Sequence, residues 1–266
     1  MPSRISDCFS AADGQPLLVT YITGGDPDLD TTVALMRTMA DNGADLLELG
    51  VPFSDPVADG PTIQRAAQRA LSHPTPLSMP RLLEVVRQFR TTHPHTPLLL
   101  FGYYNPFLAY GLEKMAKEAA EAGVDAFLVV NLPPEEASPF KAALSRWELD
   151  MILLVSPNTP EARVARIAAE ASGFIYYVSI TGVTGTALST EDSIRKGVAT
   201  VRRHTDLPVC VGFGIRTPED AARVGALADG VVVGSALVGL VEEHGTASLS
   251  HVGGLVAELS GALQST

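Results

Sequence analysis

Three carboxylates that lie close together in the sequence are the strongest candidates for chemistry in this chain. Glu48 interrupts the apolar run 46–51, and Asp55 and Asp59 follow in a loop rich in glycine and proline. A strand that is buried on both faces reads as a continuous hydrophobic run, so a charge inside it is disfavoured unless it is protonated, paired or used. Apolar neighbours raise the pKa of a carboxyl group toward neutrality, which suits a residue that both donates and accepts protons. We therefore expect proton transfer at Glu48, with a structural ion pair as the alternative, whereas the alternative for the aspartates is turn formation at Asp-Pro and Asp-Gly.

Glycines at the ends of two later apolar runs indicate an anion site. Gly212 and Gly214 end one run, and Gly234 with Ser235 ends the next and opens a helix. Glycine lets the backbone approach a ligand closely, and a helix N-terminus presents unpaired N–H groups to an anion. This pattern predicts a phosphate site that needs no Lys or Arg; the alternative is that the glycines only close tight turns.

A long Gly/Thr-rich segment at 179–189 follows another apolar run. A loop of this length beside a site is a candidate lid that excludes water when it closes. The alternative is an ordinary surface loop.

Short apolar runs alternate with amphipathic segments along almost the whole chain, and this alternation predicts the elements that position these residues. We expect strands at 17–23, 46–50, 97–103, 126–131, 151–155, 174–179, 208–213 and 230–234. We expect helices at 29–42, 61–72, 78–91, 111–122, 135–146, 160–171, 190–203, 218–227 and 247–262. Eight such units predict an α/β fold, a (β/α)₈ TIM barrel with an extra N-terminal helix, as a single domain over residues 1–266, with its chemistry where strands end. The alternative, an open doubly wound sheet, lacks its Gly-x-Gly-x-x-Gly fingerprint after the first strand.

Composition excludes several classes of partner. The net charge of −11 argues against nucleic acid or acidic lipid. Cys8 and Cys210 do not make a disulfide framework, the opening residues lack the apolar core of a signal peptide, and the longest apolar run, 230–241, is too short to span a bilayer. We expect a cytoplasmic protein that does not contact the membrane.

The positions of lysine and histidine exclude two further chemistries. All lysines fall inside expected helices, so none is available for a Schiff base (Lys114, Lys117, Lys141 and Lys196). None of the six histidines falls at an expected strand end, and no pair has metal-ligand spacing on one helix face, so we expect no metal site. A phosphosugar isomerase is disfavoured for the same reason, because its electrophilic His or Lys is missing.

Six motifs are distributed along the chain: Thr23-Gly24-Gly25-Asp26-Pro27, Glu48-Leu49-Gly50-Val51-Pro52-Phe53-Ser54-Asp55-Pro56, Ala58-Asp59-Gly60-Pro61-Thr62-Ile63-Gln64, Gly182-Val183-Thr184-Gly185, Gly212-Phe213-Gly214-Ile215 and Gly234-Ser235. With these motifs the chain resembles the tryptophan synthase alpha subunit family over nearly all of its 266 residues. The resemblance implies a barrel that cleaves indole-3-glycerol phosphate to indole and glyceraldehyde 3-phosphate. It implies that Glu48 transfers the protons, that Asp59 holds the indole N–H, and that this subunit needs no cofactor.

The resemblance also implies the surroundings of the substrate. The implied substrate-binding set is Tyr21, Leu100, Tyr176, Thr184, Gly185, Gly212, Gly214, Gly234 and Ser235. Within it, Tyr21 and Leu100 enclose the indole, Tyr176 lies beside Glu48, and Thr184 meets Asp59 on closure.

A partner is implied as well. The family pairs its alpha subunit with a beta subunit that carries pyridoxal phosphate and receives indole through a tunnel, in an alpha2–beta2 heterotetramer. Asp55, Pro56 and Asn105 are expected to face this partner. One departure is Asn131, where the family usually has Asp, and this change bears on lid coupling or partner signalling. Two alternatives stay open: a free-standing indole-glycerol-phosphate lyase without a beta partner, and a non-catalytic allosteric barrel.

Overall fold

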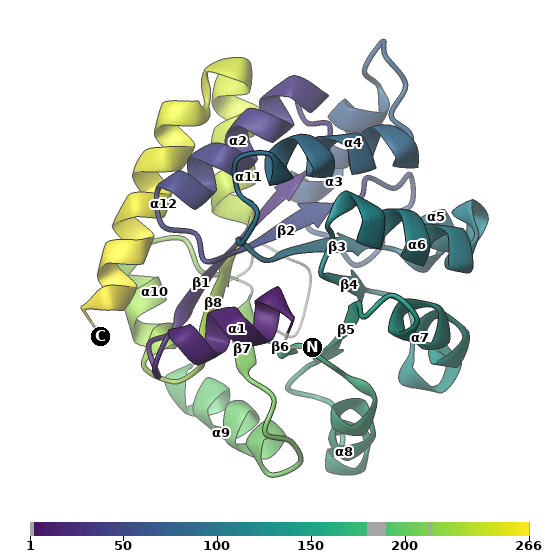
Figure 1. The fold of residues 1–266 in the computed structure, drawn as a ribbon. Coiled ribbons are helices and arrows are strands. Elements are labelled where there is room, and N and C mark those ends of the chain that lie inside the picture. The colour runs from purple at the N-terminus through teal and green to yellow at the C-terminus, as the bar shows by residue number, and fades with distance from the viewer. Residues whose placement is uncertain (1–2, 180–189, 213, 266) are drawn as a thin grey trace.

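Eight parallel strands form a closed barrel in the order β1 to β8 in the computed structural model, which describes residues 3–179, 190–212 and 214–265 (Figure 1). The strands are β1 Leu17–Thr23, β2 Leu46–Gly50, β3 Leu98–Gly102, β4 Ala126–Val129, β5 Asp150–Val155, β6 Ile175–Val178, β7 Val209–Gly212 and β8 Gly230–Val233. The barrel closes because β8 pairs with β1, with Leu17 opposite Gly230. The predicted (β/α)₈ barrel is confirmed.

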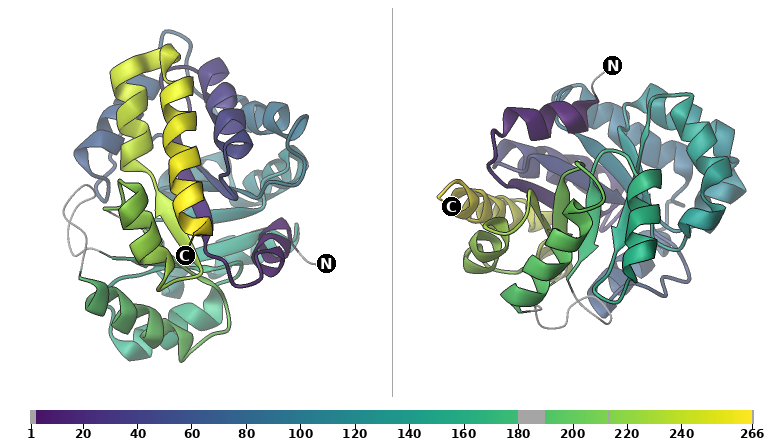
Figure 2. Two further views of the ribbon diagram at one scale, coloured as in Figure 1. Left: turned by 90° about the vertical axis from the view of Figure 1, so that its left-hand side faces the viewer. Right: turned by 90° about the horizontal axis from the view of Figure 1, so that it is seen from below.

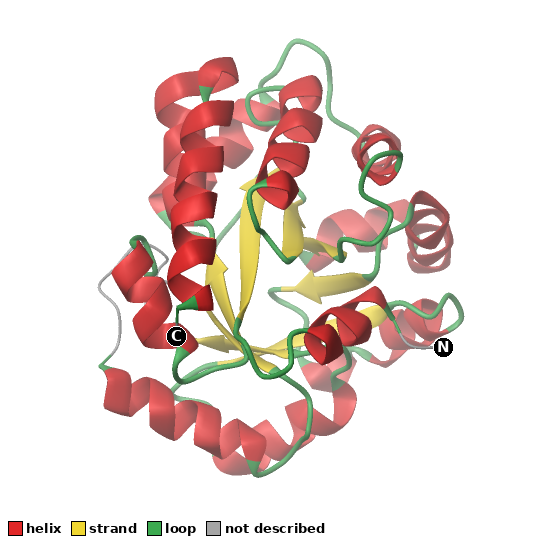
Figure 3. Ribbon diagram, turned by 60° about the vertical axis from the view of Figure 1, so that its left-hand side comes forward, coloured by secondary structure: helices red, strands yellow, loops and turns green. Residues whose placement is uncertain are grey.

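Helices surround the barrel as an outer ring (Figure 3). They are α1 Arg4–Ala11, α2 Leu29–Asp41, α3 Pro61–Leu71, α4 Met79–Arg90, α5 Tyr104–Tyr110, α6 Leu112–Ala122, α7 Ser138–Ser145, α8 Glu161–Glu170, α9 Glu191–Arg202, α10 Pro218–Gly225, α11 Ser235–His244 and α12 Leu249–Gln264, with short 3₁₀ turns at Pro134–Glu136 and Gly245–Ala247. The last helix, α12, packs against both α2 and α10 and so completes the ring (Figure 2). Helix α5 was not predicted, because its seven residues are too few to show a helical period.

The strands alternate their side chains between the barrel interior and the layer under the helices. In β2, Leu46 belongs to the interior cluster, and Leu47 and Leu49 belong to the larger cluster that packs against the helices. Successive side chains of a strand point to opposite faces, so Glu48 shares the interior side with Leu46. The sequence of β2 therefore sends one carboxylate into an apolar barrel.

Helix α1 covers the N-terminal end of the barrel (Figures 1 and 2). Ile5 is fully buried in the interior cluster, and the ring of Phe9 lies 6.0 Å from that of Phe174. Arg4 fixes this helix through an ion pair with Asp125, at 2.7 Å between Nη1 and Oδ1. The predicted extra N-terminal helix is confirmed, and it leaves the C-terminal ends of the strands as the open face of the barrel.

No helix in the described part of the chain is long and apolar enough to cross a membrane.

Candidate functional site

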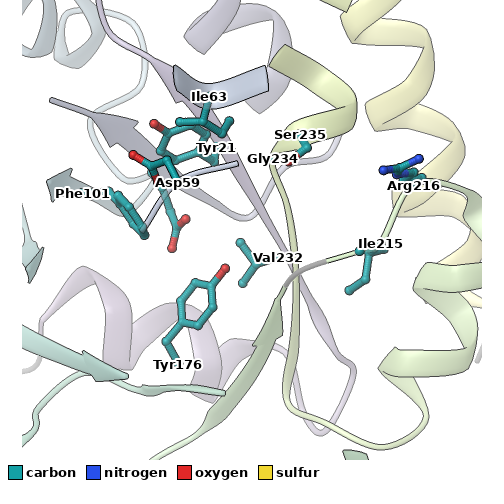
Figure 4. Close-up of a pocket in the computed structure, with 12 residues that line it drawn as sticks. Tyr21, Asp59, Ile63, Phe101, Tyr176, Ile215, Arg216, Val232, Gly234 and Ser235 are labelled. Atoms are coloured by element: carbon teal, nitrogen blue, oxygen red, sulfur yellow. The ribbon is translucent and has the colours of Figure 1, made fainter. Parts of the chain in front are cut away.

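A cavity lies at the C-terminal ends of the strands (Figure 4). It is lined by Tyr21, Glu48, Asp59, Ile63, Phe101, Tyr176, Gly214, Ile215, Arg216, Val232, Gly234 and Ser235. These residues come from loops and strands spread over most of the chain. Two of the three candidate carboxylates, Glu48 and Asp59, and five of the predicted substrate-binding residues are therefore brought together, whereas Asp55 lies outside the cavity.

Glu48 is buried in this cavity with only 1% of its surface exposed. Among the described residues, its Oε1 atom has no hydrogen-bond partner and its carboxylate has no ion pair. Burial raises the pKa of Glu48 from 4.5 to about 8. The described residues therefore offer Glu48 no ion pair, which was the alternative to proton transfer. The carboxyl is available to exchange a proton.

Asp59 ends the loop that enters α3, and 9% of its surface is exposed. Its Oδ2 accepts a hydrogen bond from the hydroxyl of Tyr103 at 3.2 Å, and that hydroxyl in turn accepts from the backbone N–H of Ala58 at 2.9 Å. Burial raises the pKa of Asp59 to about 6, and the hydrogen bond from Tyr103 opposes this rise. The turn here is closed by backbone, from Asp59 N–H to Pro56 O at 3.0 Å, so the side chain is left for the cavity.

Tyr103 was missed by the sequence interpretation. It follows β3 in the run Gly102-Tyr103-Tyr104-Asn105, so a polar aromatic at a strand end was the available signal. That signal did not show that the loop after β2 would fold back over this tyrosine.

Two glycines leave room for the tyrosines that flank Glu48. A Cβ on Gly50 would lie 2.2 Å from the hydroxyl oxygen of Tyr21, and a Cβ on Gly212 would lie 2.1 Å from that of Tyr176. No side chain fits at such distances, so both tyrosines depend on glycine in the neighbouring strand. Gly212 thus leaves space for the Tyr176 side chain and does not itself line the cavity.

Substituting Gly50 with alanine should displace Tyr21 and lower the free energy of unfolding by about 2 kcal/mol, as overpacking does in other cores. It should also lower kcat/KM, because Tyr21 lines the cavity. Urea unfolding and a steady-state assay measure the two effects. The matched control is Gly254→Ala, whose Cβ would meet nothing within 4 Å and should leave stability equal or up to about 1 kcal/mol higher. Equal stability for Gly50→Ala and the parent chain would contradict the close contact.

The prediction that Leu100 encloses the indole does not match the structure. Leu100 is fully buried in the layer between the strands and the helices, whereas Phe101 lines the cavity. The rings of Phe101 and Tyr21 meet edge to face, with centroids 5.3 Å apart. Adjacent residues of a strand face opposite sides, so an error of one residue exchanges the interior for the helix layer.

Three residues of the predicted anion site, Gly214, Gly234 and Ser235, line one end of the cavity, which we call its anion end. Gly234 caps α11 without a side-chain hydrogen bond, so the first N–H groups of this helix are not capped by that residue. Gly214 has a φ of +86°, a conformation that favours glycine. Thr184, Gly185 and most of the expected lid fall outside the described residues.

An ion-pair cluster holds the two helices that border the cavity. Arg69 on α3 donates to Asp26 through two nitrogens, each at 2.8 Å, and to Glu242 on α11 at 2.9 Å. Arg65, also on α3, is bidentate to Glu242. Because Asp59 precedes α3 and Ser235 begins α11, this cluster sets the carboxylate and the anion end of the cavity relative to each other.

The residues expected to face a partner lie at the surface. Asp55 and Asn105 are exposed and Pro56 is partly so, beside Val57, which is 77% exposed. Asn131 has a structural task at this end, since its Oδ1 accepts from the backbone N–H of Tyr104 at 2.8 Å and so caps the start of α5.

No group of three or more His, Cys, Asp or Glu side chains suited to a metal ion occurs among residues 3–179, 190–212 and 214–265.

A closed (β/α)₈ barrel with two buried carboxylates in one cavity at the strand ends defines the class of protein, a barrel enzyme. The family model described as "Tryptophan synthase alpha chain" matches residues 9–262, and the chain belongs to this family. The family consists of carbon–carbon lyases of tryptophan biosynthesis that cleave indole-3-glycerol phosphate, so the resemblance seen in the sequence is confirmed. The family also implies a complex with a beta subunit.

Individual relatives agree. The tryptophan synthase alpha chain of Geobacter sulfurreducens is 51% identical over 249 residues, which cover 93% of each chain. That of Geotalea uraniireducens is 52% identical over 260 residues, covering 97% of this chain and 96% of the relative. Among solved structures, tryptophan synthase subunit alpha from Legionella pneumophila has a TM-score of 0.91 at 39% identity, with 99% of each chain covered. A chain of Mycobacterium tuberculosis tryptophan synthase has a TM-score of 0.90 at 34% identity, also over 99% of each chain.

Proposed function

We propose that Glu48 and Asp59 carry out the cleavage of indole-3-glycerol phosphate in this member of the family. The observation that carries the proposal is the pair of environments: Glu48 is buried without a cation and its pKa is raised to about 8, whereas the pKa of Asp59 in the same cavity is raised only to about 6. At neutral pH one carboxyl is therefore protonated and the other ionised. Two carboxyls whose pKa values are separated by their surroundings can divide the roles of acid and anion between them.

The proposed reaction begins with protonation of the indole ring. The acid form of Glu48 donates its proton to C3, using the electrons of the C2–C3 double bond, and positive charge develops at the ring nitrogen. The carboxylate of Asp59 accepts a hydrogen bond from the ring N–H and stabilises that charge. Glu48 is left as a carboxylate beside the glycerol chain.

The second step breaks the carbon–carbon bond. The electron pair of the bond between C3 and the glycerol carbon returns to the ring and restores indole, while the hydroxyl on that carbon becomes an aldehyde. Glu48 takes the hydroxyl proton and regains its starting state. Nothing is oxidised or reduced, so the proposal needs no cofactor in this chain, and pyridoxal phosphate belongs to the beta partner.

The shape and lining of the cavity support one orientation of the substrate. The ring is proposed to lie among the apolar and aromatic residues Tyr21, Phe101 and Tyr176, and the phosphate at Gly214, Gly234 and Ser235, with Thr184 and Gly185 added from the loop outside the described residues. Asp55, Pro56 and Asn105 are proposed to face the beta subunit in an alpha2–beta2 assembly. A cytoplasmic location accords with this biosynthetic role.

The decisive assay is indole release from indole-3-glycerol phosphate by the full chain, alone and with a tryptophan synthase beta subunit. Release that increases when the beta subunit is added supports the proposal. Release that is unaffected by the beta subunit, with no complex on gel filtration, would favour the free-standing lyase. No release in either case would favour the non-catalytic barrel.

The pH dependence of kcat/KM should be bell-shaped. Activity should fall as pH rises above about 8, because free Glu48 then loses the proton that it must donate. Activity should also fall below about 6, because Asp59 then becomes protonated and cannot stabilise the ring. Initial rates of indole release from pH 5 to pH 10 test both limbs. A rate that climbs steadily through pH 9.5 would show that Glu48 starts as a carboxylate and would contradict the proposed first step.

A further inference from the structure

The charge balance of the cavity is unfavourable for a phosphorylated substrate. The chain carries a net charge of −11, and the cavity contains the carboxylate of Asp59. A phosphomonoester adds roughly −1.5 to −2 charges at pH 7. Backbone N–H groups orient such an anion but supply only partial charges.

Arg216 is the only Lys, Arg or His among the described residues that line this cavity. It lies at the rim, on the side of Gly234 and Ser235, away from Tyr21 and Asp59 (Figure 4). Its side chain is exposed, so holding a cation here carries little desolvation cost.

The backbone of Arg216 is fixed from both directions. Ile215, immediately before it, is 3% exposed and packed into the helix-side core. The backbone N–H of Arg216 donates to Asp220 Oδ2 at 3.2 Å. The other oxygen of Asp220, Oδ1, accepts from Arg223 at 2.6 Å, which holds the Asp220 side chain in place.

We propose that Arg216 binds the phosphate group of the substrate and makes the site selective for phosphorylated over unphosphorylated compounds. The proposal rests on the proposed function, since it takes the phosphate to lie at Gly214, Gly234 and Ser235. The guanidinium offers two parallel N–H donors to phosphate oxygens and always carries its charge, so it adds a full positive charge where the backbone offers only dipoles. The sequence predicts an anion site that needs no Lys or Arg, and the proposal adds Arg216 to that site.

Binding can be measured without turnover, using glycerol 3-phosphate as the probe and titration calorimetry on the full chain. Arg216→Gln should weaken binding about tenfold, the scale of one charge-assisted contact. Arg216→Lys keeps the charge but loses the paired donors, and should weaken binding by about threefold or less. The matched control is Arg195→Gln, which removes an exposed arginine of the neighbouring helix α9 that does not line the cavity and should leave binding within about twofold.

Kinetics give a second readout. Arg216→Gln should lower kcat/KM about tenfold, mainly through KM, and should make kcat/KM less sensitive to added NaCl because part of the steering charge is gone. Unaltered probe binding by Arg216→Gln would overturn the proposal, as would equal losses in Arg216→Gln and Arg195→Gln. Repeating the titration in a Glu48→Gln background separates the two hypotheses, because phosphate binding is then tested in a chain whose proposed chemistry has been removed.

Discussion

Glu48→Gln should reduce kcat for indole release by about 10³-fold or more, because both proposed proton transfers use this one carboxyl and each is worth about 10²- to 10⁴-fold. Glutamine keeps the size and polarity of the side chain but cannot donate and recover a proton. Binding of glycerol 3-phosphate should stay near that of the parent chain, since the anion end of the cavity is built from other residues. The control is Glu84→Gln, at a carboxylate whose side chain is 54% exposed. Retention of a tenth of the parent turnover would remove Glu48 from the mechanism.

The same substitution should make the protein more stable. The pKa of Glu48 is about 8 in the folded chain and near 4.5 when unfolded, so between these values the folded chain holds more protons and stability falls as pH rises. Glutamine carries no such penalty. The gain should therefore be small near pH 4.5 and reach its full size, on the order of 5 kcal/mol, above pH 8. Urea unfolding of both proteins at pH 5 and pH 9 measures the difference, and a gain of the same size at both values would contradict burial of the charge as its cause.

Asp59→Asn should lower kcat by about 10²- to 10³-fold, because the neutral amide cannot offset the positive charge that develops on the indole ring. The amide oxygen can still accept the hydrogen bond from Tyr103, so the loop should keep its position. Single-turnover indole release measures the effect on chemistry, and circular dichroism checks the fold. The control is Asp41→Asn, at an aspartate whose side chain is 68% exposed.

An undiminished rate in Asp59→Asn would assign this residue to the loop structure alone. A loss that tracks KM with kcat unchanged would instead make Asp59 a residue of ground-state binding.

The barrel and Glu48 could be predicted because both leave a local signal in the sequence. Eight apolar runs of strand length alternate with helical periods, and a charge inside one of those runs is conspicuous. Which side chains of a strand face the barrel interior could not be predicted for Leu100 and Phe101. Both are apolar, and only the register of the whole barrel decides which one faces inward.

Contacts between loops could not be predicted in the same way. The hydrogen bond from Tyr103 to Asp59 joins residues 44 positions apart, and it exists because the loops after β2 and β3 pack together. Arg216 follows a glycine-rich strand end, which in the sequence indicates only backbone donors. The fold shows that Arg216 lines the cavity. The role of Asn131 could not be predicted either, because it accepts a hydrogen bond from the first residue of α5, Tyr104, and this helix is too short to predict.

The helix that seals one end of the barrel also determines how molecules travel. Ile5 and Phe9 cover the N-terminal end of the barrel, so among the described residues the cavity is reached from the C-terminal ends of the strands. A partner bound at this face, where Val57 is exposed, would affect both substrate entry and product release. The eight residues of α1 and the packed interior above them therefore leave binding and release to the C-terminal face of the barrel.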